Sequence, residues 1–247
     1  MNLKKHIPNT LTLLNLFAGL CALIHAFNGN YAEAFSLVCL GIFFDYWDGF
    51  LARILDVKSE LGLQLDSLAD MVTSGVVPGL IVYKMLADIQ ENQAQYSLTE
   101  ETYFMGVVPY IGFLITLGSC YRLANFNIDT RQTDSFIGLP TPANALMICS
   151  LPIILEQTGG ESFVFDYLSN PYVLVGIAFI STFLLNAEIP LFSLKLKSFA
   201  WGPNKLQYSF LLVSLALLVA LEFAAIPLII VAYVLTSLLF KPSTSHL

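Results

Sequence analysis

The stretch DYWDGFLARILDVKSELGLQLDSLAD, residues 45–70, places six acidic side chains in a chain that is otherwise strongly apolar. Of the 247 residues, 56% are hydrophobic and only 12% are charged, and the mean hydropathy is +0.72. Soluble proteins carry about 25% charged residues. The composition therefore indicates an integral membrane protein, in which acidic side chains at membrane depth are costly and need a physical explanation.

Apolar segments close to the length that spans a bilayer recur along the chain. About 20 helical residues cross the hydrocarbon core, because each residue adds about 1.5 Å. We count eight segments, at 8–28, 31–54, 62–87, 103–126, 141–157, 171–192, 207–222 and 224–240. The last two predict a tight hairpin that turns between Glu222 and Pro227. The expected fold class is all-α, a polytopic membrane helical bundle of about eight transmembrane helices.

The basic residues predict how these segments are oriented. Lysine and arginine in short loops stay on the cytoplasmic side, whereas acidic residues contribute little. With eight segments and a cytoplasmic amino terminus, only Lys84 lies outside. The other ten basic residues fall on or near the cytoplasmic side: Lys4, Lys5, Arg53, Lys58, Arg122, Arg131, Lys195, Lys197, Lys205 and Lys241. We therefore expect a multi-pass protein of the cell inner membrane with both termini and the active site cytoplasmic, and no nucleic-acid partner.

Four aspartates gather where the second segment ends and the third begins. Residues three or four apart share a helix face, which pairs Asp45 with Asp48 and Asp66 with Asp70. The helical rise separates the members of each pair by only about 4.5–6 Å. Because the second segment runs inward and the third returns, the two pairs can converge below the membrane surface.

This concentration of negative charge requires cations. An unpaired charge at membrane depth costs at least about 2.5–3.5 kcal/mol, and Arg53 can neutralise only one carboxylate. Aspartate oxygens without histidine or cysteine at ligand spacing suit hard ions such as Mg²⁺ or Mn²⁺, and a pair of such ions supports displacement at phosphorus. Helix geometry alone also allows a water-filled ion or proton path. Gly49, Ala52 and Gly62 favour phosphoryl transfer, since small residues let a ligand approach closely.

These residues resemble the signature of the CDP-alcohol phosphotransferase family, D-x-x-D-G-x-x-A-R-x8-G-x3-D-x3-D. All eight fixed positions match: Asp45, Asp48, Gly49, Ala52, Arg53, Gly62, Asp66 and Asp70. The resemblance implies a core of six membrane helices, here residues 1–192, followed by a cytoplasmic loop and a terminal transmembrane hairpin at 193–247. It also implies a homodimer that transfers the substituted phosphate of a CDP-linked lipid or alcohol to a hydroxyl and releases CMP.

The same resemblance implies a role for each signature residue. Two divalent ions, Mg²⁺ or Mn²⁺, would be held by Asp45, Asp48, Asp66 and Asp70. Asp70 would also be the general base for the acceptor hydroxyl. The nucleotide would lie on Asp48, Gly49, Ala52, Arg53 and Gly62. Asn9 and Thr12, near the start of the first segment, would contact nucleotide or phosphate, or else cap their own helix.

Three further stretches resemble the membrane-embedded phosphatidylserine synthases of that family: IPNTLTLLNLFAGL at 7–20, DSLADMVTSGVVPG at 66–79 and YRLANFNIDTRQTDSFIGLPTPANA at 121–145. The resemblance implies CDP-diacylglycerol, a membrane lipid, and L-serine as substrates. Asn125 departs from the pattern, because that subfamily usually has arginine there. The alternative is the same chemistry with glycerol 3-phosphate, which would demand more positive charge than this chain offers.

Two charged residues inside the predicted segments are candidates for substrate contact. Arg122 can bind the carboxylate of serine through paired hydrogen bonds, or it merely marks the cytoplasmic end of its helix. Glu188, in the predicted sixth span, makes a structural hydrogen bond or contacts substrate. Pro78 is expected to kink the third helix.

Overall fold

The protein is built almost entirely from helices, as the sequence predicts. The computed structural model describes residues 6–57, 59–94, 106–129, 136–160, 162–192, 202 and 204–239. Its α-helices are α1 (His6–Phe27), α2 (Tyr31–Ile54), α3 (Glu60–Asp70), α4 (Val77–Ala94), α6 (Phe113–Ile128), α7 (Thr141–Thr158), α8 (Phe163–Leu168), α9 (Pro171–Asn186), α10 (Lys205–Leu221) and α11 (Ala225–Leu239). Shorter elements connect them: the π-helix η2 (Met71–Val76), the 3-10 helices η3 (Val108–Gly112) and η4 (Glu222–Ala224), and strands β1 (Phe136–Ile137) and β2 (Pro190–Leu191).

Each predicted segment corresponds to one helix or to helices in direct succession. The second begins and ends as predicted, the third comprises α3, η2 and α4, and the predicted hairpin turns at η4. Among the described residues, four helical stretches are long and apolar enough to cross a membrane: His6–Phe27, Tyr31–Ile54, Glu60–Glu91 and Lys205–Leu239. The shorter helix α9 is also apolar. The count of eight crossings stays a prediction.

The outer surfaces of the bundle are apolar. On α1, the exposed large side chains recur every three or four residues and form one stripe: Leu13, Phe17, Leu20, Ile24 and Phe27. Helix α10 has no buried residue although its sequence is strongly apolar. Water would solvate such surfaces poorly, whereas lipid chains match them. The chain is therefore an integral membrane protein.

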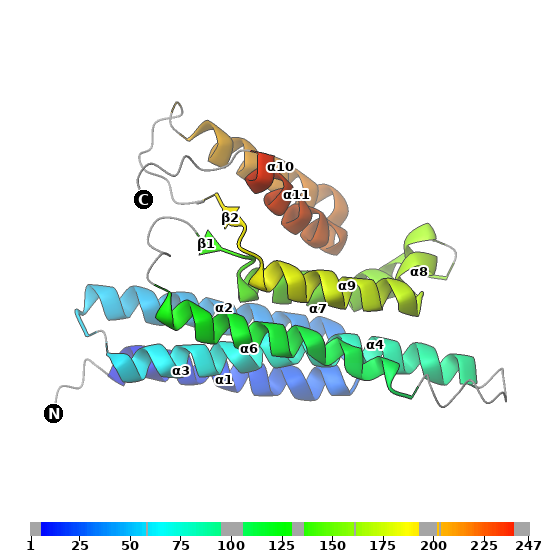
Figure 1. The fold of residues 1–247 in the computed structure, drawn as a ribbon, viewed down its shortest axis with the longest axis horizontal. Helices are drawn as coiled ribbons and strands as arrows, with labels where there is room; N and C mark the ends of the chain where they lie inside the picture. The colour runs from blue at the N-terminus through cyan, green and yellow to red at the C-terminus, as the bar shows by residue number, and fades with distance from the viewer. Residues whose placement is uncertain are drawn as a thin grey trace.

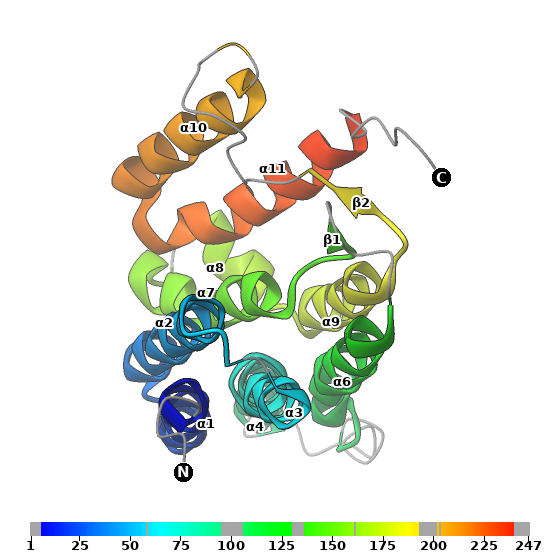
Figure 2. The same ribbon diagram turned by 90° about the vertical axis from the view of Figure 1, so that its left-hand side faces the viewer.

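Helices α1, α2, α3, α4, α6, α7 and α9 form one bundle. They run roughly along the long axis of the molecule (Figure 1) and lie side by side in the end-on view (Figure 2). Helix α11 packs on α7, and α10 lies beyond α11 as an outer layer (Figure 2). The domain boundary between 192 and 193 stays a prediction, because residues 193–200 lie outside the described residues.

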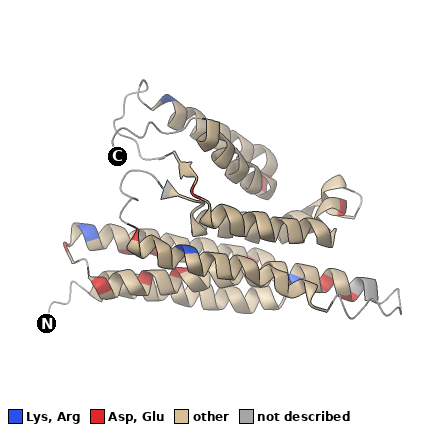
Figure 3. Ribbon diagram, in the orientation of Figure 1, with Lys and Arg blue, Asp and Glu red and all other residues tan. Residues whose placement is uncertain are grey.

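Charged residues lie mainly away from the apolar middle of the molecule, and α9 and α11 have none (Figure 3). Arg53 at the end of α2 and Lys205 at the start of α10 lie at the same end of the molecule, and α4 with Lys84 runs toward the other end (Figure 1). Seven of the basic residues used to predict the topology are outside the described residues: Lys4, Lys5, Lys58, Arg131, Lys195, Lys197 and Lys241. The cytoplasmic orientation therefore stays a prediction.

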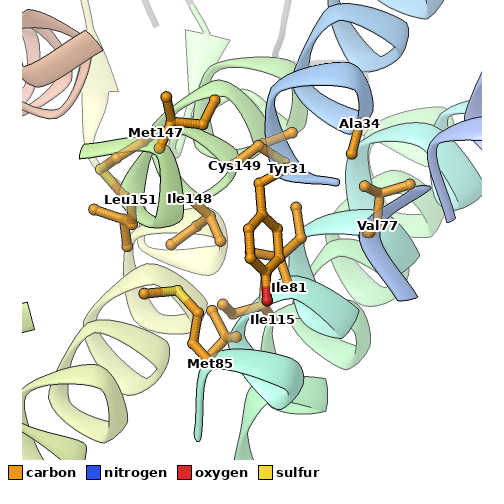
Figure 4. Packing of buried hydrophobic residues seen from close by; sticks show 14 of the residues in the cluster. Tyr31, Ala34, Val77, Ile81, Met85, Ile115, Met147, Ile148, Cys149 and Leu151 are labelled. Carbon is orange, nitrogen blue, oxygen red and sulfur yellow. The ribbon is translucent and has the colours of Figure 1, made fainter. Parts of the chain in front are cut away.

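The hydrophobic core lies where α2, α4, α6 and α7 meet (Figure 4). Ala34, Ile81, Ile115 and Ile148 come from these four helices, and none of them is exposed to solvent. Fully burying a large aliphatic side chain contributes about 1.5–3 kcal/mol in water. This core joins α2, which carries Asp45 and Asp48, to α4, α6 and α7.

The sequence predicts a kink at Pro78, and the structure has a π-helix just before this residue. Proline has no N–H group to donate to the preceding turn. The π-helix η2 ends at Val76, just before Pro78. Hydroxyl groups join this region to the neighbouring helices α6 and α1. Thr116 Oγ1 donates to the carbonyl oxygen of Gly75 at 3.0 Å, and Thr73 Oγ1 donates to the carbonyl oxygen of Asn15 at 3.1 Å.

Helix α9 ends at Asn186, earlier than the predicted end at 192. Glu188 is exposed and lies in the connection to β2, so the expectation that it belongs to the sixth helix is wrong, and its place relative to the membrane stays a prediction. Asn186 makes the structural hydrogen bonds here, because its Nδ2 donates to the carbonyl oxygens of Gly118 at 3.1 Å and Thr182 at 3.0 Å. The bond to Gly118 joins the end of α9 to α6, and the bond to Thr182 lies within α9.

Strands β1 and β2 pair antiparallel, with Phe136 opposite Leu191, an element that the sequence did not predict. Gly138 follows β1 with a φ of 77° and donates its N–H to the carbonyl oxygen of Ile189 at 3.0 Å. A Cβ atom at this position would lie 2.7 Å from the carbonyl oxygen of Leu185. Both the positive φ and the close approach therefore require glycine.

We predict that Gly138→Ala lowers the thermal stability of the protein in detergent more than Gly159→Ala does. Gly159 has a φ of 64° but no atom near its Cβ position. The control therefore loses only about 1–3 kcal/mol for its positive-φ backbone, whereas the clash at Gly138 adds about 1–3 kcal/mol to the corresponding cost there. Equal melting temperatures for the two variants would contradict the close packing of Gly138 against α9.

Candidate active site

Three of the four aspartates meet at one point. Asp45, Asp48 and Asp66 each offer a carboxylate oxygen, and these three atoms lie within 4.8 Å of one another. The first two come from α2 and the third from α3. Asp48 is buried, and the other two are half-buried. The convergence predicted from helix geometry is present for these three side chains.

Asp70 lies beside this group, at the last position of α3. Its side chain is buried and interacts electrostatically with those of Asp45, Asp48 and Asp66. Its Oδ1 accepts a hydrogen bond from Nδ2 of Asn15 at 3.0 Å. The three-residue group does not include Asp70, so its role as a metal ligand stays a prediction.

Helix α1 contacts both halves of the aspartate set through Thr12 and Asn15. Thr12 Oγ1 donates to Oδ2 of Asp48 at 2.5 Å, and Asn15 bonds to Asp70. Both polar side chains are buried, and they share a helix face because they are three residues apart. The sequence analysis missed Asn15. The available signal was a polar residue one turn after Thr12 in an otherwise apolar segment.

The expectation that Thr12 or Asn9 caps α1 is wrong, because this helix begins at His6 and both residues lie inside it. Asn9 lies next to the start of α3, where a Cβ atom on Gly62 would be 3.4 Å from its Oδ1. Ser59 caps α3 instead, since its Oγ accepts the N–H of Gly62 at 3.0 Å. Contact of Asn9 and Thr12 with nucleotide or phosphate stays a prediction.

Within the described residues, no basic side chain forms an ion pair with the group of three aspartates. The expectation that Arg53 neutralises one of them is wrong. Arg53 is exposed, and its Nε donates to the carbonyl oxygen of Gly49 at 2.9 Å. Converging carboxylate oxygens without a basic partner are the ligand set that hard divalent cations prefer. The residues at this point fit Mg²⁺ or Mn²⁺.

The predicted nucleotide surface lies along the last turns of α2. A Cβ atom on Gly49 would meet no other atom within 4 Å, so the space beside this residue is open. Ala52 and Arg53 follow three and four residues later, on the same helix face. The exposed guanidinium of Arg53 can therefore reach a phosphate or a base that lies over Gly49. The nucleotide-binding role itself stays a prediction.

Arg122 faces Asp70 from α6. Its side chain is only 8% exposed, and Asp70 attracts its guanidinium electrostatically. Its Nε has no hydrogen-bond partner in the described part of the chain. The residue lies six positions before the end of α6 at Ile128, so it does not mark the end of its helix. Asn125, which departs from the subfamily pattern, is exposed on the same helix.

Comparisons with known proteins agree with the signature. The family model described as CDP-alcohol phosphatidyltransferase matches residues 5–184. A relative from Bacillus subtilis named CDP-diacylglycerol–serine O-phosphatidyltransferase is 33% identical, with 61% of this chain and 80% of the relative covered. Proteins of the same name are 30% identical in Methanocaldococcus jannaschii, with 71% of each chain covered, and 32% identical in Helicobacter pylori, with 61% of this chain and 58% of the relative covered. The chain belongs to the CDP-alcohol phosphatidyltransferase family.

Proposed function

We propose that this protein transfers the phosphatidyl group of CDP-diacylglycerol to the hydroxyl of L-serine, giving phosphatidylserine and CMP. The observation that carries the proposal is the group of Asp45, Asp48 and Asp66 next to the buried pair of Asp70 and Arg122. A group that can hold metal thus lies beside a carboxylate that can act as base and beside a cation. The names of the relatives support serine as the acceptor.

The CDP-alcohol phosphotransferases depend on divalent metal, and the donor set of this chain fits it. Asp45, Asp48 and Asp66 would hold the metal, with Asp70 as a further ligand if two ions of Mg²⁺ or Mn²⁺ bind. Bound metal would offset the charge of the pyrophosphate and of the departing CMP. An ion or proton path explains neither the match to the family nor the glycine, alanine and arginine positions of the signature.

The protein side chains would carry out the proton transfer and the positioning. Asp70 takes the proton from the serine hydroxyl, and the freed oxygen attacks the phosphorus attached to diacylglycerol. The bond from this phosphorus to the oxygen of CMP then breaks. Asn15 holds one carboxylate oxygen of Asp70 and leaves the other available for the serine proton. Arg122 binds the carboxylate of serine, and the surface around Gly49, Ala52, Arg53 and Gly62 holds the cytidine nucleotide.

The proposed reaction takes place at the cytoplasmic side of the inner membrane. CDP-diacylglycerol reaches the site from the cytoplasmic leaflet, its acyl chains remaining among the helices, and serine arrives from the cytosol. The family resemblance further predicts a homodimer. Glycerol 3-phosphate is the less favoured acceptor, because the relatives reported above carry serine in their names and a phosphate dianion would require more basic side chains than Arg122.

We predict that the purified protein incorporates labelled L-serine into phosphatidylserine when CDP-diacylglycerol and Mg²⁺ or Mn²⁺ are present. Thin-layer chromatography of the lipid product measures this activity, and a chelator should abolish it. A product formed from glycerol 3-phosphate but not from serine would keep the phosphotransfer and refute the acceptor. Ion flux through liposomes without any CDP-lipid reaction would refute both.

We predict that Asp70→Asn lowers the turnover number by at least about a hundredfold, since general-base catalysis contributes about 10²–10⁴. Binding of CDP-diacylglycerol should weaken only modestly. Single-turnover measurements with saturating substrates separate the two effects. Near-normal turnover in this variant would show that another group takes the proton.

We predict that Asn15→Leu lowers the turnover number about tenfold or more, because a hydrogen bond to a charged group contributes about 1.5–3 kcal/mol. The Michaelis constants should change little. The matched control is Thr73→Val, which removes the hydroxyl bonded to the carbonyl oxygen of Asn15 but leaves the bond to Asp70 intact. A control variant that loses as much turnover per folded protein would indicate a purely structural role for Asn15.

A further inference from the structure

Helix α6 runs antiparallel to α3 and η2 (Figure 1), and hydrogen bonds and close contacts fix their register. At one end, Nδ2 of Asn127 donates to Oγ of Ser67 at 2.8 Å. Further along, a Cβ atom on Gly75 would lie 3.1 Å from Cβ of Ser119, so the two helices nearly touch. Between these two contacts, Asp70 and Arg122 attract each other across the interface.

Buried polar atoms without partners concentrate along this interface. Within the described residues, no hydrogen bond reaches Nε of Arg122, Oγ of Ser74, Oγ of Ser119 or Oδ1 of Asn127. Ser74 and Ser119 are 0% exposed. Nearly all buried polar groups in proteins are hydrogen-bonded, so several unpaired groups in one place require an explanation, and a bound molecule is one that fits a substrate site. Solvent cannot satisfy the two serine hydroxyls from outside the bundle.

The four side chains of Asp70, Ser74, Ser119 and Arg122 form what we call the acceptor strip. Ser74 follows Asp70 by four residues, and Ser119 precedes Arg122 by three. Because the helices are antiparallel, both hydroxyls lie on the same side of the Asp70 and Arg122 pair, about one helical turn along the axes. A small molecule with three polar groups on adjacent carbons matches this spacing.

We propose that the acceptor strip is a subsite for an α-amino acid, in which the hydroxyls of Ser74 and Ser119 bind the ammonium group of the acceptor. This inference rests on the proposed function and extends it, since it assigns the group that distinguishes an amino acid from other hydroxyl acceptors. The guanidinium of Arg122 has only donors, so it suits the carboxylate and cannot accept from an ammonium. Hydroxyl oxygens accept hydrogen bonds, and Ser74 and Ser119 have theirs free.

The acceptor strip would therefore select for serine by its three polar groups. Asp70 receives the hydroxyl, Arg122 the carboxylate, and the two buried serines the ammonium. An acceptor that lacks the amino group leaves both hydroxyls unsatisfied, as they are in the unliganded chain. A site built to hydrogen-bond a substrate group rejects analogues that lack it more strongly than an apolar pocket does.

The test compares Ser74→Ala and Ser119→Ala with Ser150→Ala. Ser150 is an equally buried serine, but its Oγ already donates to the carbonyl oxygen of Met147 at 2.8 Å. We expect each of the first two variants to raise the KM for L-serine about tenfold or more, as loss of a hydrogen bond to a charged group would. The KM for CDP-diacylglycerol should stay at the wild-type value, and Ser150→Ala should change neither constant.

A second measurement isolates the ammonium. The inhibition constant of 3-hydroxypropanoate, which lacks the amino group, is measured against labelled serine in the same variants. We expect it to stay within about twofold of the wild-type value in Ser74→Ala and Ser119→Ala, because the lost contact is absent in this analogue. Equal weakening of serine and the analogue would overturn the assignment, as would an unchanged KM for serine. A wild-type protein that makes no lipid from serine refutes the proposed function instead.

Discussion

The gathering of four carboxylates in an apolar bundle, two of them buried and two half-buried, is the constraint on which the arrangement of this protein depends. Each charge at membrane depth costs at least about 2.5–3.5 kcal/mol unless something offsets it. The chain offsets part of this cost with groups from three helices. Thr12 and Asn15 of α1 donate to Asp48 and Asp70, and Arg122 of α6 faces Asp70. What remains uncompensated is the group of three oxygens that fits a divalent cation.

Close packing of α1 against its neighbours makes these hydrogen bonds possible. A Cβ atom on Gly41 of α2 would lie 2.7 Å from Cγ2 of Thr73 and 2.8 Å from Oδ1 of Asn15. Glycine at this position therefore lets α1, α2 and η2 approach until Asn15 reaches Asp70. The π-helix begins directly after Asp70, and Thr73 anchors it to the backbone of α1. The position of Asp70, the proposed base, is thus set by backbone contacts as much as by its own side chain.

The sequence was sufficient to predict the fold class, the limits of α2, the terminal hairpin and the convergence of Asp45, Asp48 and Asp66. The length of an apolar segment indicates a helix that can cross a membrane. The spacing of the signature residues determines which helix faces carry the aspartates. Asn15 and the exposed position of Arg53 could not be found in this way, because they depend on which helices touch. The order of the segments places α2 opposite α3 but does not show that α1 packs against both. The end of α9 at Asn186 was missed because apolar residues continue into β2.

The residues on the two sides of Asp70 have different proposed roles. Those on one side serve the reaction common to the family, and those on the other select the acceptor. Toward α1 and α2 lie the signature residues, whose types follow from the charge of a pyrophosphate and would serve any acceptor alcohol. Toward α6 lie the other three members of the acceptor strip. Ser74, Ser119 and Arg122 are outside the signature. A change of substrate would then require changes only in α6 and η2, while the metal ligands and the base stay fixed. In the proposed mechanism Asp70 belongs to both sides, because the proton that it would take comes from the acceptor and its charge lies next to the carboxylates that would hold the metal.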